Sequence, residues 1–173
     1  MSMNTRLYRK IYERQAAFYQ THRWAKVALL LLNYALTASV LALYVSLLAF
    51  RAVETDWFGL WLCMLFPVGC FCAVFVVRQV FPRKRPYDIN GAGIQPVFKK
   101  LHASDKSFPS RHIAMTFAIG GVWLAYSLRI GILTYVAGIL LGYIRFSAGL
   151  HYPTDLLGGA LMGGGFGVLI FAF

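Results

Sequence analysis

Long apolar stretches separated by short polar links dominate the chain. They cover roughly 24–50, 57–81, 113–128 and 130–146, and a last one runs from about residue 153 to the C-terminus. The first, at about 27 residues, is long enough to cross a bilayer with some tilt. The pattern predicts an all-α membrane protein, a bundle of about five transmembrane helices.

The first 23 residues follow another pattern, in which apolar and tyrosine side chains recur at helical spacing among basic ones. Leu7, Ile11 and Phe18 belong to the apolar set, and Arg9 and Lys10 belong to the basic one. Such a segment is typical of an amphipathic helix that lies on the membrane surface. We interpret it as an interfacial anchor and topology signal, with a lipid-headgroup dock as the alternative.

Composition agrees with a membrane protein. Of the 173 residues, 59% are hydrophobic and 13% are charged, and the mean hydropathy is +0.61, which is too apolar for an ordinary soluble domain. We therefore expect one membrane-embedded domain over residues 1–173, with the interfacial helix at 1–23 and the transmembrane bundle at 24–173. A polar stretch at about 82–109, interrupted by glycine and proline, is predicted to be a loop that does not cross the membrane.

The formal net charge of +11 suits either nucleic acid or anionic lipid. No nucleic-acid fold signature accompanies the charge, and the basic residues cluster beside the apolar stretches. We expect anionic membrane lipids and phosphate groups as partners, and no nucleic acid. Cys63, Cys70 and Cys72 lie in one apolar stretch without metal-ligand spacing, so we expect free thiols and no metal site there.

The stretch GYIRFSAGLHYPTD, at 142–155, sets Arg145, His151 and Asp155 among apolar residues at the edge of a membrane segment. Charges in that position are costly unless they have a function. A His that attacks phosphorus, an Asp four residues later that orients its ring and an Arg that holds an anion form a phosphate site. The alternative interpretation is an interfacial Arg, a loop His and a helix-capping Asp.

A topology of five helices brings further polar residues to the same membrane face. The second apolar stretch ends in the basic loop, the third starts from it, and the fourth ends where the fifth begins. One charged pocket at one interface is the economical prediction. Its members are Arg78, Arg85, Ser110, Arg111, His112, Arg145, His151 and Asp155.

Three short motifs carry a resemblance to a known family. They are RQVFPRKRP at 78–86, PSRH at 109–112 and IRFSAGLHYPTD at 144–155. In order and spacing they resemble the type 2 phosphatidic acid phosphatase superfamily, membrane lipid-phosphate phosphatases related to vanadium haloperoxidases, whose pattern is Lys-x6-Arg-Pro, Pro-Ser-Gly-His and Ser-Arg-x5-His-x3-Asp. The chain departs from this pattern at Arg78, where the family has Lys, at Arg111, where it has Gly, and at Ile144, where it has Ser.

The resemblance implies a role for each of these residues. His151 would be the nucleophile that forms a phosphohistidine, Asp155 would orient its ring, and His112 would protonate the leaving oxygen. The phosphate would be held by Arg78, Arg85, Ser110, Arg111 and Arg145, whose cations make a metal ion or another cofactor unnecessary. Arg83 and Lys84, at variable positions of the first motif, are interpreted as rim or headgroup contacts.

The expected function is hydrolysis of a phosphomonoester or diphosphate on a membrane lipid. A lipid phosphotransferase and a catalytically silent lipid-binding relative are the alternatives. The resemblance leaves the lipid open among phosphatidic acid, phosphatidylglycerophosphate, undecaprenyl pyrophosphate and lipid A.

The expected location is a bacterial plasma membrane, crossed several times. The basic N-terminal residues favour a cytoplasmic site face by the positive-inside tendency, whereas many bacterial relatives suggest the outer face. Gly159 and Gly163, at four-residue spacing in the last stretch, predict close helix packing inside the bundle, with a homodimer through this helix as the alternative.

Overall fold

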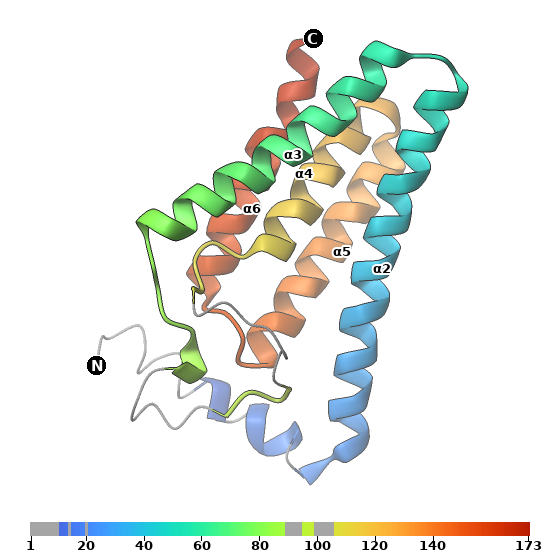
Figure 1. The fold of residues 1–173 in the computed structure, drawn as a ribbon. Coiled ribbons are helices and arrows are strands. Elements are labelled where there is room, and N and C mark those ends of the chain that lie inside the picture. The colour runs from blue at the N-terminus through green and yellow to red at the C-terminus, as the bar shows by residue number, and fades with distance from the viewer. Residues whose placement is uncertain (1–10, 14, 20, 89–94, 99–105) are drawn as a thin grey trace.

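The computed structural model describes residues 11–13, 15–19, 21–88, 95–98 and 106–173. The described residues form five long helices and two short 3-10 helices, and they contain no strand (Figure 1). The all-α prediction is therefore confirmed. The elements in chain order are α2 (Arg23–Val53), α3 (Trp57–Val80), η1 (Pro86–Asp88), α4 (Arg111–Tyr126), α5 (Leu128–Ser147), α6 (Pro153–Val168) and η2 (Leu169–Ala172).

Four helical stretches of the described chain are long and apolar enough to cross a membrane. They are α2, α3, α5 and the continuous stretch Pro153–Ala172. The fifth long helix, α4, has 16 residues, which at 1.5 Å per residue is about 24 Å. It packs against α5 and α6 and lies between them, behind the oblique α3 (Figure 1). This arrangement fits the expected membrane bundle of about five helices.

The contact between α4 and α6 depends on glycine. Gly159 and Gly163 of α6 face the α4 backbone, and a Cβ at Gly163 would collide with the carbonyl oxygen of Ala114. The small-residue spacing seen in the sequence thus lets two helices approach closely within one chain. Gly164 and Gly165 face open space instead.

Local signals explain where α3 begins and ends. Asp56 caps α3 by accepting a hydrogen bond from the Gly59 N–H at 3.0 Å, and it pairs with Arg51 at 2.8 Å. At the other end of α3, Pro82 follows shortly after the last helical residue and prevents its continuation. Between these two signals, α3 runs back obliquely across the bundle from the end where α2 finishes (Figure 1).

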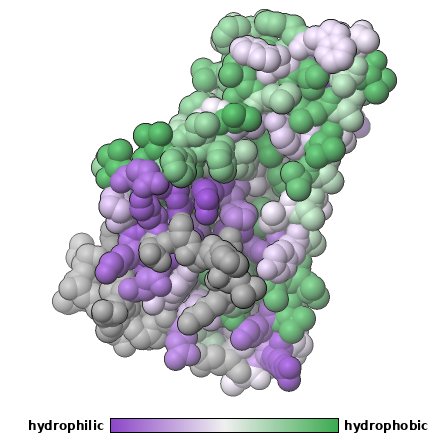
Figure 2. All heavy atoms as spheres, in the orientation of Figure 1, coloured by the Kyte–Doolittle hydropathy of each residue, from purple (hydrophilic) through white to green (hydrophobic). Residues whose placement is uncertain are grey.

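The surface separates into apolar and polar zones along the bundle. Apolar side chains cover most of the helices, and hydrophilic side chains gather at the end where α3 finishes and α4 begins (Figure 2). Exposed side chains such as Trp61, Phe75 and Leu133, each more than half accessible, belong to the apolar zone. Such a surface suits contact with lipid rather than water.

The described part of the N-terminal segment, 11–13 and 15–19, is helical and packs under the bundle at this polar end. Tyr12 and Ala16 are buried in a cluster with Tyr152. The segment therefore has a packing role beside the predicted anchoring role. Residues 1–10 of the predicted amphipathic helix, and 89–94 and 99–105 of the predicted polar loop, lie outside the described residues.

Candidate active site

The turn between α5 and α6 presents the candidate nucleophile. The Leu150 N–H donates to the Arg145 carbonyl at 3.0 Å, and Gly149 has a φ of +75°, a conformation that suits glycine. A Cβ at Gly149 would lie 2.9 Å from the Tyr12 ring, so this turn also requires a residue without a side chain. His151 follows the turn and is buried, with 3% of its surface exposed.

His151, Asp155 and Ser107 form a buried group. The His151 Nδ1 lies 3.7 Å from the Asp155 Oδ2 and 3.5 Å from the Ser107 Oγ. Ser107 donates a hydrogen bond to the same carboxylate oxygen, and the Tyr152 N–H donates to it at 2.9 Å. These donors fix the carboxylate beside Nδ1, which leaves Nε2 as the ring nitrogen for attack on a substrate.

The environment of His151 lowers its pKa from 6.5 to about 4. Burial is the largest cause, because it disfavours the imidazolium, and the positive charges of Arg85 and Arg145 act in the same direction. Asp155 opposes the shift. The ring is therefore neutral at physiological pH, which is the form that a nucleophile or a general base requires.

Arg145, near the end of α5, is fully buried, and its three side-chain nitrogens have no hydrogen-bond partner among the described residues. The Ser110 Oγ, at the start of α4, is also buried without a partner in the described part of the chain. A buried guanidinium without an acceptor is costly unless an anion joins it. Its fork of donors matches the oxygens of a phosphate group.

Arg78 and Arg85 are buried, and both donate to backbone carbonyls. The Arg78 Nη1 donates to Pro109 at 2.8 Å, and its Nη2 donates to Lys106. The Arg85 Nη1 reaches the Leu150 carbonyl at 3.3 Å. Arg78 thus braces the segment before α4 and Arg85 braces the turn before His151, in addition to the positive charge that each brings to the site.

Arg111 and His112, in the first turn of α4, are half-buried and line an apolar groove of about 450 Å³. The groove also takes side chains from α2, α3 and α5, and the exposed Leu41 and Phe71 lie at its surface. The structure therefore places the candidate acid, His112, beside an apolar groove whose lining includes neither His151 nor Arg145.

Two residues that are not members of the predicted pocket contact Asp155 in this site. Arg83, a predicted rim contact, is partly exposed, and its Nη1 pairs with the Asp155 Oδ1 at 2.9 Å and donates to the Thr154 Oγ1 at 2.6 Å. Its guanidinium also lies 4.2 Å from the centre of the Tyr152 ring. Ser107, fully buried, was not singled out. Arg83 occupies a variable position of the first motif and Ser107 lies two residues before the second, and this proximity is the only signal in the sequence.

An all-α membrane bundle that gathers a His–Asp pair and buried arginines at one end has the features of a membrane phosphoryl-transfer protein. Residues 58–173 match the PAP2 superfamily, and this match covers more than half of the chain. The chain therefore belongs to the PAP2 superfamily, as the motifs had indicated.

Individual relatives match parts of this chain. The Bacillus subtilis undecaprenyl-diphosphatase BcrC is 39% identical over 72 residues, which are 42% of this chain and 37% of that protein. A lipid A 1-phosphatase of Rhizobium etli is 28% identical over 125 residues, 69% of this chain and 51% of that protein. The matches thus span about a third to a half of these relatives.

A solved structure shares the fold. The crystal structure of Aquifex aeolicus LpxE superposes with a TM-score of 0.73 and 24% sequence identity, over 100% of this chain and 97% of the other. At that identity the likeness supports the arrangement of the helices and nothing further.

Proposed function

We propose that this protein removes phosphate from a lipid phosphomonoester or diphosphate. The observation that carries the proposal is the fully buried Arg145 guanidinium, which has no acceptor among the described residues and whose charge acts on His151. An anion that accepts hydrogen bonds from this guanidinium would lie close to the imidazole of His151, which is neutral and is oriented by the Asp155 carboxylate. A phosphate ester bound there is in position for phosphoryl transfer.

The reaction proceeds in two steps. The Nε2 of His151 attacks the terminal phosphorus in line, and the bond from this phosphorus to the leaving oxygen breaks. The leaving oxygen belongs to the lipid alcohol of a monoester or to the lipid phosphate of a diphosphate, and a protonated His112 gives it a proton. Water then attacks the phosphohistidine, His112 takes back a proton, and inorganic phosphate leaves. Asp155 holds the Nδ1 proton in both steps and stabilises the positive charge that develops on the ring.

The position of His112 supports its role as the acid. It lines the apolar groove, and we assign the lipid part of the substrate to that groove, with the oxygen that leaves with the lipid directed toward His112. The groove opens beside exposed apolar side chains of α2 and α3, which favours entry of the substrate from the bilayer. Arg111 lines the same groove, and we assign it to the phosphate of the entering headgroup.

The positive charge in this mechanism comes from arginine. In this mechanism Arg145 binds the transferring phosphate, and Ser110 donates a hydrogen bond to it from its hydroxyl. Arg78 and Arg85, which also donate to backbone carbonyls, add positive charge. Together these groups stabilise the equatorial oxygens as negative charge develops on them. We therefore expect turnover in excess chelator and inhibition by vanadate, which mimics the trigonal bipyramidal transition state.

The test is release of inorganic phosphate from a panel of lipids in mixed micelles with chelator present. The panel contains undecaprenyl diphosphate, a lipid A 1-phosphate, phosphatidic acid and phosphatidylglycerophosphate, each with and without an alcohol acceptor. Phosphate release without an acceptor supports the phosphatase. Transfer only in the presence of an acceptor indicates a phosphotransferase, and binding without any turnover indicates a silent lipid-binding relative.

We further propose a bacterial plasma membrane and a cytoplasmic site face, because Arg23 and Lys26, in the first turn of α2, lie at the same end of the bundle as the site. Single cysteines at Lys84, at the site end, and at Glu54, at the other end, test this in a variant without the native cysteines. An impermeant thiol reagent should label only Glu54→Cys in intact cells, and the reverse pattern contradicts the orientation. A homodimer through the open Gly164–Gly165 face of α6 is a separate proposal, tested by cross-linking.

A further inference from the structure

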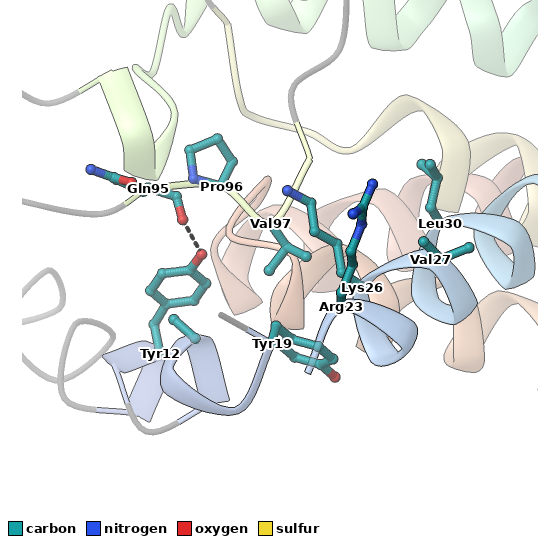
Figure 3. A pocket seen from close by; sticks show the side chains of 10 residues that line it. Tyr12, Tyr19, Arg23, Lys26, Val27, Leu30, Gln95, Pro96 and Val97 are labelled. Carbon is teal, nitrogen blue, oxygen red and sulfur yellow. Dashed lines mark hydrogen bonds between the residues drawn. The ribbon is translucent and has the colours of Figure 1, made fainter. Parts of the chain in front are cut away.

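A second cavity, of about 610 Å³, lies at the polar end of the bundle between the N-terminal segment, the start of α2 and residues 95–97 (Figure 3). Its lining includes Tyr12, Arg23, Lys26 and Val97, and it includes none of the residues assigned above to the active site. Figure 3 shows the side chains of Arg23 and Lys26 projecting from α2 beside Val97. The cavity is therefore separate from the active site, although it lies close to the turn that carries His151.

One face of α2 lines this cavity, and the lining side chains change from cationic to aliphatic along the helix. Arg23, Lys26, Val27 and Leu30 all belong to the lining, and positions i, i+3, i+4 and i+7 share one side of a helix. The two cations come first, and the two aliphatic residues follow further into the membrane-spanning part of α2. No ion pair joins either cation to a carboxylate among the residues that the structure describes. The surface is thus cationic at the membrane edge and apolar below it.

We propose that this cavity binds an anionic membrane phospholipid, with the headgroup phosphate on Arg23 and Lys26 and the start of the acyl chains on Val27 and Leu30. A lipid matches both halves of this lining, whereas a free phosphate ion matches only the cationic half. The exposed Trp24, beside the cations, is the type of side chain that marks the headgroup level.

The lipid also acts on the active site, because two walls of the cavity hold the turn before His151. The Val97 N–H donates to the Ala148 carbonyl at 3.1 Å. Tyr12 packs against Gly149, and its hydroxyl donates to the Gln95 carbonyl (Figure 3). A lipid lodged between these walls would hold both contacts in place, so turnover should rise with the fraction of anionic phospholipid. This coupling rests on the proposed phosphatase activity, but the binding does not.

The binding is tested with phosphatidylglycerol, a phosphodiester that a phosphomonoesterase does not consume. Native mass spectrometry of the detergent-solubilised protein gives the apparent affinity for this lipid in wild type, in Arg23→Gln/Lys26→Gln, and in Arg129→Gln, which loses a cation at an exposed position outside the cavity. We expect a loss of about 30-fold, equivalent to about 2 kcal/mol, in the first variant and less than about 3-fold in the second. Equal losses in both variants, or no loss in the first, would overturn the site. Displacement of the lipid by inorganic phosphate alone would overturn the assignment of a lipid.

The coupling is tested by phosphate release in phosphatidylcholine vesicles with increasing phosphatidylglycerol. Wild type should accelerate as the anionic lipid is added, whereas Arg23→Gln/Lys26→Gln should keep the rate it has in pure phosphatidylcholine. A parallel rise in both proteins would overturn the coupling. Because the binding measurement needs no turnover, its outcome stands whether or not the phosphatase proposal holds.

Discussion

Replacing Arg145 with methionine should make the protein more stable and less active at the same time. The side chain is fully buried, and its three nitrogens have no hydrogen-bond partner among the described residues. Methionine fills a similar space without a charge. If the guanidinium stabilised the fold, its removal would lower the free energy of unfolding. The sign of the stability change therefore separates a structural role from a phosphate-binding one.

The magnitudes follow from the burial. An uncompensated buried ion costs several kcal/mol, and recovery of even about 1 kcal/mol of that raises the melting temperature by roughly 2–4 °C in a chain of this size. Removing one donor to the developing negative charge lowers kcat by about 10²- to 10³-fold. Vanadate at about 100 times its Kd should stabilise wild type by about 2.7 kcal/mol, and the variant should lose this effect.

The measurements are thermal unfolding of the detergent-solubilised protein, with and without vanadate, and phosphate release under the same conditions. Arg129→Met is the matched control, because Arg129 is exposed at the opposite end of the bundle. It should change neither quantity. A melting temperature that falls in Arg145→Met while kcat stays near wild type would refute the assignment of Arg145 to the phosphate.

Two further predictions concern the environment of the site and the packing beneath it. Because His151 has a pKa lowered to about 4, the acid limb of the pH profile of kcat/KM should fall well below pH 6.5. Arg85→Gln removes a charge that lowers this pKa, so it should move the acid limb to higher pH. An acid limb that does not move would show that another group titrates there. Gly163→Ala should lower the melting temperature by several degrees, because the added Cβ meets the Ala114 carbonyl. Gly164→Ala should leave the melting temperature unchanged, because Gly164 faces open space. Equal melting temperatures in the two variants would contradict the close packing of α6 on α4.

Much of the fold could be predicted because membrane helices follow from apolar length alone. The observed α5 and α6 begin and end within a few residues of the apolar stretches, and the small-residue spacing of Gly159 and Gly163 is used between helices as expected. The boundary of α4 was less visible, because Pro109 and Ser110 suit either a loop or a first helical turn. The observed helix begins at Arg111.

The site was predictable only as far as its motifs reach. Asp155 follows His151 by one helical turn, so their proximity is written in the local sequence. The contact of Tyr12 with Gly149 joins positions far apart in the chain, and no spacing rule connects them. Arg83 likewise stands among several basic residues, and only the fold determines which of them meets Asp155.

The central claim is that His151 carries the phosphoryl group during turnover. The direct measurement is a rapid alkaline quench of the enzyme during reaction with a labelled lipid diphosphate, followed by peptide mapping for a phosphoryl group on histidine. The mechanism predicts label on His151 within the first turnover, and neither label nor phosphate release in His151→Ala. Label on another side chain, or phosphate release by His151→Ala at the wild-type rate, would contradict it.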